Sequence, residues 1–325
     1  MNFNELAPAK EPTFYFIGVT TGKSSIMKVF PAWAKHLGIS QTIKGIDCKS
    51  HSDPEVYRRI VSFLREDKFS LGSLVTTHKL DLLEAARDYF EWLDPYAIQL
   101  SEVSSISKRD GVLRGHATDH IASGLSFDAM TKGGNIVTNN PEVCILGAGG
   151  SAIALTIHLF NLEESRCPSK IYVTDQNEKR LKDMEEVHKK IECRIPKEYI
   201  LCMTAKENNN VVDKLREGAL VINATGLGKD VPGSPLTDAV VFPKNGLAWD
   251  FNYRGDLVFL DQAKAQQESK NLTIHDGWVY FVRGWLSVIS EVFNIYIPSE
   301  GPEFKKLCEI AANPVSYTHL RAHET

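Results

Sequence analysis

The sequence has 325 residues, 43% hydrophobic and 24% charged, with a formal net charge of -4. This length leaves room for two domains, and the composition is that of a soluble globular protein. The charge gives no reason to expect nucleic acid or an anionic membrane as a partner, and no apolar run approaches the length that spans a bilayer. The first residues lack the pattern of a secretion signal.

Six cysteines form no CxxC pair and have no histidine cluster near them. This usage predicts reduced thiols in a cytoplasmic protein, with neither a disulfide framework nor a metal site.

Strands and helices alternate along the first third of the chain. Strands are expected at 13–21, 41–48 and 70–77, followed by helices at 24–39, 54–67 and 81–93. This order is typical of a mostly parallel α/β sheet. A hairpin over 102–115 should turn at Asp110-Gly111, and a helix should follow over 120–130.

A stretch rich in glycine and asparagine, residues 131–142, is the predicted linker. The pattern then restarts, with strands expected in VCILGAGG, KIYVTD, YILCMT, LVINAT and LAWDFNY. Helices between these strands indicate a second doubly wound sheet. An aromatic helix over 276–293 should return to the first domain. Residues 313–325 follow no periodic pattern and resemble translated adapter sequence, so we expect a disordered tail foreign to the fold.

The segment VCILGAGGSAIALTIHL indicates a strand, a glycine-rich turn and a helix. Gly147, Gly149 and Ala152 match the GxGxxG/A fingerprint, which provides a tight turn, a close backbone approach to a pyrophosphate, and close packing of helix on strand. With Gly150 and Ser151 they form a predicted dinucleotide site at a helix N-terminus. A tight turn without a ligand is the alternative.

Asp175 ends the next predicted strand, where the fingerprint expects an acid for the ribose hydroxyls. A carboxylate there would repel the 2′-phosphate of NADP. We therefore predict NAD as the preferred cofactor and NADP as the second choice. Asp175 can also cap the following helix, and the two roles can coexist.

Taken in this order, these segments resemble the shikimate and quinate dehydrogenase family up to about residue 293. VTTHK resembles the family's VTxPHK segment with one residue fewer, and SSISKRDGVLRGHATD resembles its VNT…DGxLxGxNTD segment. GAGGSAIA matches the family's GAGGxxxA turn, and INATGLG resembles INATPLG. WDFNY followed by DGWVYFVRGW resembles the closing segments.

The resemblance implies an α/β fold with two doubly wound domains. A substrate-binding domain with a mostly parallel sheet would comprise residues 1–121, completed by helices within 276–312. A Rossmann domain that binds NAD or NADP would comprise residues 122–275. The implied activity is a reversible hydride transfer between nicotinamide and a secondary alcohol or ketone of a cyclic hydroxy acid such as shikimate, within aromatic amino acid biosynthesis.

The family's functional positions fall on a small set of residues here. Its catalytic pair corresponds to Lys79 and Asp119. Substrate-binding positions correspond to Ser24, Thr76 and Tyr253, and nicotinamide-side positions to Asn223 and Thr225. From the residues alone, an ion pair that braces a helix start is the favoured interpretation of Lys79 and Asp119, and the resemblance reverses this preference. Tyr253 can be a core residue, and Asn223 and Thr225 can cap a strand end.

Several family positions have changed. Ile26, Ser104, Ala117 and Gly284 stand where the family has polar groups that hold the substrate. Each lost buried hydrogen bond would weaken the binding of a polyhydroxylated ring by about 1 kcal/mol or more. The family's NADP-binding arginine is replaced by Gln176, which agrees with a preference for NAD.

Two other functions remain open. The chain can be a dinucleotide-binding regulator that has lost catalysis, or another two-domain dehydrogenase such as the methylenetetrahydrofolate type. In the leading interpretation the partner is a small-molecule substrate, without nucleic acid, membrane or metal, and the protein is a monomer or homodimer.

Overall fold

The structure is a computed structural model that describes residues 1–131, 140–229 and 231–315. The chain divides into two compact units. Unit 1 contains Met1–Thr118 and the residues from Gly284 onward, and unit 2 contains Asp119–Arg283. Helix α11 (Trp278–Phe293) supplies residues to both units.

Unit 1 is an α/β unit with a six-stranded sheet. Its strands are β1 (Thr13–Gly18), β2 (Thr42–Asp47), β3 (Ser70–Val75), β4 (Trp92–Leu93), β5 (Ser105–Arg109) and β6 (Val112–His116). Its α-helices, besides the second part of α11, are α1 (Ile26–Leu37), α2 (Pro54–Glu66), α3 (Lys79–Ala86), α4 (Pro95–Leu100) and α12 (Gly301–Val315). Single 3-10 turns are η1 (Phe3–Glu5), η2 (Thr21–Lys23) and η3 (Arg87–Tyr89).

The strand order in this sheet is β2-β1-β3-β5-β6-β4. Strands β1, β2 and β3 are parallel, and β5 is antiparallel to both β3 and β6. Strands β3 and β6 therefore run in the same direction, and the chain leaves β1, β3 and β6 at one common edge of the sheet.

Both faces of the unit 1 sheet are covered by helices, as alternation along β1 shows. The rings of Phe14 and Phe16 contact Trp285 of α11 at centroid distances of 6.3 and 5.0 Å. Tyr15, between them in sequence, contacts Phe63 of α2 on the opposite face at 5.4 Å. Successive strand residues point to opposite faces, so all three aromatic side chains are buried.

The helix expected over 81–93 is shorter than predicted. Helix α3 ends at Ala86, and the chain then forms η3 and strand β4, which pairs in parallel with β6. The hairpin turn at Asp110-Gly111 is confirmed, with φ of 52° and 79° at its two residues. Both values lie in the left-handed region that two-residue hairpin turns of type I′ require.

Unit 2 contains a second six-stranded sheet. Its strands are β7 (Glu142–Leu146), β8 (Lys170–Asp175), β9 (Lys197–Leu201), β10 (Leu220–Asn223), β11 (Leu247–Asp250) and β12 (Thr273–His275). Its helices, besides the first part of α11, are α5 (Asp119–Thr131), α6 (Gly150–Phe160), η4 (Glu164–Arg166), α7 (Glu178–Lys190), α8 (Ala205–Val212), α9 (Val258–Lys264) and α10 (Gln267–Lys270).

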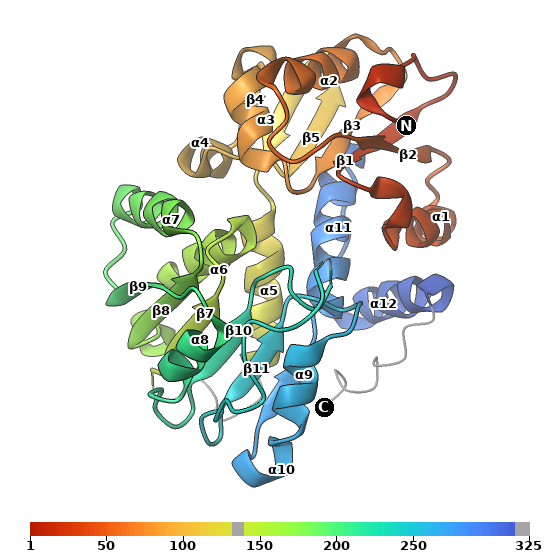
Figure 1. Cartoon of the computed structure of the whole chain (residues 1–325). Helices are drawn as coiled ribbons and strands as arrows, with labels where there is room; N and C mark the ends of the chain where they lie inside the picture. The colour runs from red at the N-terminus through yellow and green to blue at the C-terminus, as the bar shows by residue number, and fades with distance from the viewer. Residues whose placement is uncertain (132–139, 230, 316–325) are drawn as a thin grey trace. The chain divides into compact units, whose positions relative to one another are not determined.

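All strand pairs of this sheet are parallel, in the order β12-β11-β10-β7-β8-β9. Figure 1 labels the strands from β7 to β11. Numbered from β7, this is the 3-2-1-4-5-6 order of the Rossmann fold. The strand order reverses between β7 and β10, and ligands of open α/β sheets bind outside the carboxyl ends of the strands at such a switch point.

Two buried clusters cover the two faces of the unit 2 sheet. Val143 and Ile145 of β7 pack in one cluster with residues of α5, α6 and α7. Cys144 and Leu146 of the same strand pack in the other cluster with residues of α8 and α9. Helices on both faces make unit 2 doubly wound, so the predicted fold class is confirmed.

Some boundaries differ from the sequence-based expectation. The units divide at Asp119 and Gly284, whereas the predicted domain limits were 121 and 276. Strand β12 and helix α9 were not predicted. Helix α12 reaches Val315, so residues 313–315, expected to be disordered, are helical. The rest of the predicted tail, and most of the predicted linker, lie outside the described residues.

Candidate functional site

The glycine-rich turn joins β7 to α6 as the sequence predicts. Gly147 has a φ of 105°, and a Cβ atom there would lie 3.0 Å from the carbonyl oxygen of Ala224. Only glycine tolerates both conditions. A Cβ atom at Gly149 would meet nothing within 4 Å, so the start of α6 is open to a ligand. Ala152 is fully buried in the core cluster, where its small side chain lets α6 pack on the sheet.

The carboxylate of Asp175 points back to the glycine-rich turn. Its Oδ2 accepts a hydrogen bond from the Ala148 amide at 2.8 Å, and its Oδ1 accepts one from the Asn177 amide at 2.8 Å. The side chain of Asn177, and not that of Asp175, caps helix α7 by accepting from the amides of Lys179 and Arg180. A carboxylate accepts about four hydrogen bonds, so Asp175 retains capacity for a ligand.

Asn223 organises the turn after β10. Its Oδ1 accepts from the amide and the hydroxyl of Thr225 at 3.0 and 2.6 Å. Its Nδ2 donates to Asp250 Oδ1 at 3.1 Å. The side chain of Asn252 donates to the carbonyl oxygens of Thr225 and Leu227, both at 3.1 Å. These bonds build the turn at the switch point of the sheet, and any contact of Asn223 or Thr225 with a cofactor remains a proposal.

Asp250 at the end of β11 is a buried acid that the sequence did not single out as a site residue. The residue is fully buried, and its Oδ2 has no hydrogen-bond partner among the described residues. Burial raises the pKa of this carboxyl to about 7, and the nearby Asp276 carboxylate adds to the rise, while hydrogen bonds from Asn223 and Asn252 oppose it. The sequence carried a signal for this residue, because the acid in WDFNY stands at the carboxyl end of a predicted parallel strand.

Tyr253 follows shortly after Asp250. Its half-buried ring lies against Phe281 and Trp278, at centroid distances of 4.5 and 5.4 Å. These contacts give Tyr253 a packing role within unit 2, and its predicted contact with substrate remains a proposal.

Lys79 is the first residue of α3 and is half-buried. The chain reaches it from β3 through a three-residue turn in which the His78 amide donates to the carbonyl oxygen of Thr76. The middle residue, Thr77, has a φ of 44°, which is unusual for a β-branched residue. This turn places Lys79 directly beyond the carboxyl end of β3.

Residues Val103 and Ser104 connect Lys79 with the end of β6. The amide of Val103 donates to the carbonyl oxygen of Lys79 at 3.2 Å. The hydroxyl oxygen of Ser104 accepts from the amide of Thr118 at 2.7 Å. Asp119 directly follows Thr118 in the chain and begins α5. Both residues of the predicted catalytic pair therefore follow strands that end at the same edge of the unit 1 sheet.

The predicted substrate residues Ser24 and Thr76 follow β1 and β3 at this edge. The amide of Ser24 donates to the carbonyl oxygen of Thr21 at 2.9 Å, and the hydroxyl of Thr76 donates to the carbonyl oxygen of Ile17 at 3.3 Å. Thr21 fixes the loop because its amide and hydroxyl both donate to Asp47 Oδ1, at 2.8 and 2.6 Å.

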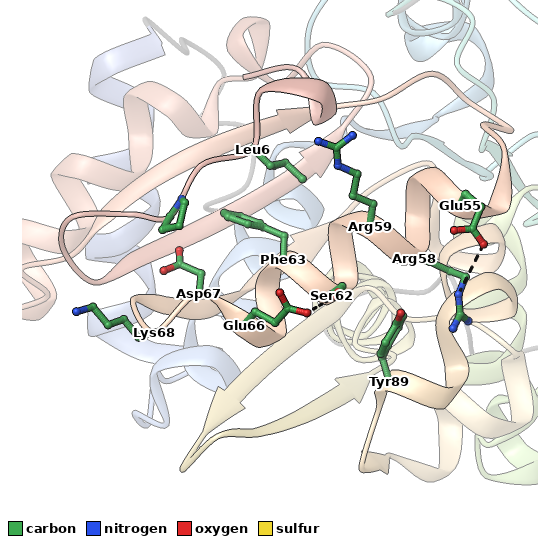
Figure 2. Close-up of a pocket in the computed structure, with 11 residues that line it drawn as sticks. Leu6, Glu55, Arg58, Arg59, Ser62, Phe63, Glu66, Asp67, Lys68 and Tyr89 are labelled. Carbon is green, nitrogen blue, oxygen red and sulfur yellow. Dashed lines mark hydrogen bonds and ion pairs between the residues drawn. The ribbon is translucent and has the colours of Figure 1, made fainter.

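Two cavities of unit 1 have linings that do not include Ser24, Thr76 or Lys79. One of about 670 Å³ lies against α2, where Figure 2 shows Leu6, Arg59, Phe63 and Lys68 among its lining side chains. The other, of about 540 Å³, is lined by residues 2–4 and 47–53 with Val19. None of the predicted site residues lines either cavity.

No helix within 1–131, 140–229 and 231–315 is long and apolar enough to cross a membrane. Over the same ranges, no group of three or more histidine, cysteine, aspartate and glutamate side chains is arranged to hold a metal ion.

Comparison with known proteins identifies relatives in sequence. A shikimate dehydrogenase (NADP(+)) of Thermus thermophilus is 31% identical over 201 residues, which is 61% of this chain and 64% of the relative. The enzyme of the same name from Streptococcus thermophilus is 29% identical over 181 residues, 55% of this chain and 59% of the relative. The matched segments thus span less than two thirds of these relatives. No family model matches the chain.

Solved structures match over nearly the whole chain. The shikimate dehydrogenase of Aquifex aeolicus has a TM-score of 0.70 at 17% identity and covers 95% of this chain and 99% of its own. The quinate dehydrogenase of Corynebacterium glutamicum in complex with NAD has a TM-score of 0.71 at 17% identity and covers 93% and 99%. The chain therefore resembles the shikimate and quinate dehydrogenases, in sequence over part of its length and in fold over nearly all of it.

Proposed function

We propose that the chain is a nicotinamide-dinucleotide-dependent oxidoreductase of the shikimate/quinate dehydrogenase type. The observation that carries the proposal is the hydrogen bond between Asp175 and the Ala148 amide, because it places an acid beside an open glycine-rich turn at the switch point of a Rossmann sheet. The names of the relatives supply the substrate class, a cyclic hydroxy acid.

The residues proposed to contact the cofactor lie at or just beyond the carboxyl ends of the unit 2 strands. The amides of Gly149, Gly150 and Ser151 at the start of α6 would hold the pyrophosphate. Asp175 would accept hydrogen bonds from the ribose hydroxyls. Asn223 and Thr225, in the turn after β10, would lie along the nicotinamide side.

The proposed chemistry needs a proton-transfer group besides the cofactor. A bound nicotinamide supplies the hydride acceptor when an alcohol is oxidised. Lys79 and Asp119 would take up the alcohol proton and return it in the reverse direction. We propose the two residues as one catalytic pair and assign the role of base to neither of them alone.

Apolar side chains are buried at the edge of the unit 1 sheet that we propose binds the substrate. Their burial supports a substrate ring that carries fewer or differently placed hydroxyls than shikimate. Ser24, Thr76 and Tyr253 are the proposed substrate contacts. Ile26 and Ala117 stand where the family has polar groups, and both are buried as apolar side chains. The hydroxyl of Ser104 is used by Thr118. We therefore propose a cyclic hydroxy acid related to, but distinct from, shikimate.

Turnover assays test this function. We expect NAD- or NADP-dependent oxidation of at least one acid in a panel that contains shikimate, quinate and related cyclic hydroxy acids. Cofactor binding without turnover of any substrate would favour the inactive regulator, which the buried apolar residues Ile26 and Ala117 also suit. Turnover of methylenetetrahydrofolate would favour the folate type. If neither cofactor binds, the proposal is wrong.

We further propose that NAD is preferred over NADP, although the relatives found in sequence are named for NADP. In NADP the carboxylate of Asp175 would face a phosphate of about two negative charges. Gln176 offers no charge to neutralise it. Unit charges about 4 Å apart interact by roughly 4 kcal/mol at an effective dielectric constant near 20, so after screening the discrimination should be about tenfold or more.

The ratio of kcat/KM for NAD and NADP measures this preference. The double variant Asp175→Asn/Gln176→Arg should shift the ratio toward NADP. Gln176→Arg alone is the matched control, because it adds the guanidinium and keeps the carboxylate. A parent protein that prefers NADP, or a double variant with an unchanged ratio, would show that Asp175 only braces the Ala148 turn. The cytoplasmic setting and the monomeric or homodimeric state remain predictions of the sequence.

A further inference from the structure

A buried tyrosine on α2 touches the segment that carries Lys79. Tyr57 and His78 are 1% and 0% exposed. The Tyr57 hydroxyl lies 3.2 Å from His78 Nδ1, and the two ring centroids are 5.6 Å apart. His78 immediately precedes Lys79, so α2 is tied by a side-chain hydrogen bond to the turn that starts α3.

The Tyr57 hydroxyl also lies close to a residue that follows Lys79 in the chain. It lies 3.4 Å from Oδ2 of Asp81, in the first turn of α3. It also accepts a hydrogen bond from the Ser52 amide at 3.2 Å. One phenol oxygen therefore contacts the residue before Lys79 and the residue two positions after it.

The protonation states of these groups suit a neutral hydrogen-bond network. Burial lowers the pKa of His78, an effect that backbone groups of Gly18 and Cys48 and the Asp81 carboxylate oppose. Burial also raises the pKa of Tyr57 to about 12. Near neutral pH the phenol therefore keeps its proton and the imidazole is uncharged.

The turn before α3 depends on such tertiary contacts. Thr77 adopts a left-handed backbone conformation that a β-branched residue disfavours, and sparsely populated conformations persist only where the surrounding structure holds them. His78 has no side-chain cap hydrogen bond to the start of α3. Its side chain is held by Tyr57, so the local sequence alone does not determine where α3 begins.

We propose that Tyr57 is a positioning residue for Lys79, acting through His78 and Asp81. The proposal rests on the proposed function of Lys79. Without the Tyr57 hydroxyl, the turn at residues 76–78 can relax and the first turn of α3 can rotate. The Lys79 amine would then lose its fixed direction, and a small misplacement of a reacting group costs rate more than binding.

The test compares two tyrosine variants of the full chain. Tyr57→Phe removes the hydroxyl and keeps the ring. Tyr15→Phe is the matched control, because the fully buried Tyr15 also donates its hydroxyl hydrogen bond within unit 1, to Asp67 Oδ2 at 3.0 Å. Asp67 precedes β3, at the edge of the sheet opposite Lys79. Both variants should lose similar stability, so stability alone cannot explain a difference in rate.

We expect Tyr57→Phe to lower kcat by about tenfold or more, with the cofactor dissociation constant unchanged. The pH profile of kcat should also change, because the Lys79 environment changes. Tyr15→Phe should keep the kcat and the pH profile of the parent. Equal kcat values in the parent and Tyr57→Phe, or equal losses in the two variants, would overturn the proposal.

A second measurement does not depend on enzyme activity. Reductive methylation of lysines with a 13C label gives one methyl signal for each lysine, and Lys79→Arg identifies the signal of Lys79. This signal should shift or split in Tyr57→Phe and stay unchanged in Tyr15→Phe. An unchanged signal in Tyr57→Phe would overturn the proposal even if the protein is a dehydrogenase. If the parent shows no turnover but the signal moves, the proposed function fails and the positioning by Tyr57 stands.

Discussion

Replacement of Lys79 or Asp119 by alanine is expected to lower kcat by roughly 10²-fold or more, the range typical of a positioned proton-transfer group. Both residues follow strands that end at one edge of the unit 1 sheet, and Lys79 is joined to Thr118 through Val103 and Ser104. The cofactor dissociation constant should change little, because neither residue is among the proposed nucleotide contacts. Steady-state rates and cofactor titrations measure the two effects separately.

Two further variants serve as controls for charge removal. Lys108→Ala removes a lysine of unit 1 whose ammonium donates to the carbonyl oxygen of Asp67 at 2.7 Å. Asp128→Asn removes an acid of α5 that pairs with Arg166 at 2.7 Å. Both controls should keep kcat near that of the parent. Near-normal turnover in Lys79→Ala and Asp119→Ala would refute their catalytic role.

Acidification is expected to destabilise unit 2 through His188 of α7. The ring is 1% exposed, with Nε2 2.7 Å from the Thr156 hydroxyl and Nδ1 2.6 Å from the Tyr199 hydroxyl. Burial lowers the pKa of His188 to about 3, and the Lys197 ammonium contributes to this decrease. The unfolded chain, with a histidine pKa of about 6.5, therefore binds a proton that the folded chain does not bind.

This difference sets the direction and the size of the effect. The free energy of unfolding is highest above about pH 6.5, where both states are neutral, and it falls as the pH decreases toward 3. The free energy of unfolding changes by about 1.4 kcal/mol for each pH unit, so His188 contributes a loss of about 2 kcal/mol between pH 6.5 and pH 5. Urea unfolding near pH 7.5 and near pH 5, followed by hydrogen exchange of β8 amides, measures it.

The variant His188→Gln removes the titrating group. Its free energy of unfolding should be lower than that of the parent near pH 7.5, because the ring hydrogen bonds are lost, but it should fall less on acidification. His51→Gln is the control for histidine removal outside unit 2, because the exposed His51 ring pairs with Asp81 of unit 1 and should leave the exchange of the β8 amides unchanged. If acidification lowers the free energy of unfolding equally in the parent and in His188→Gln, His188 is not the source of the pH dependence.

The amino-acid sequence alone determined the alternation of strands and helices and the two special turns. Apolar periodicity is a local property, so strand β1 and helix α2 lie where it places them. The hairpin turn at Asp110-Gly111 and the turn at Gly147 have positive φ values, as their glycine-containing signatures indicate. In these places the conformational preference of one or two residues decides the structure.

The end of α3 was decided by tertiary contacts. The sequence over 81–93 has helical character, but the chain extends after Tyr89 because strand β6 offers hydrogen bonds. The Glu91 amide donates to the carbonyl oxygen of Leu113 at 3.1 Å, and the Asp94 amide donates to that of Gly115 at 3.0 Å. Strand pairing between distant segments outweighs a weak local helix preference.

The candidate site shows the same division. The sequence placed Lys79 just beyond one strand and Asp175 at the end of another, because parallel strands bring their carboxyl ends to one edge. Only the tertiary structure showed what those side chains touch. Asp175 binds the amide of Ala148, Asp250 binds Asn223, and Tyr57 binds His78 next to Lys79. Each bond joins residues more than twenty positions apart in the chain. Such pairs meet only when whole helices and strands pack together, so apolar periodicity and turn signatures, which are local, cannot predict them.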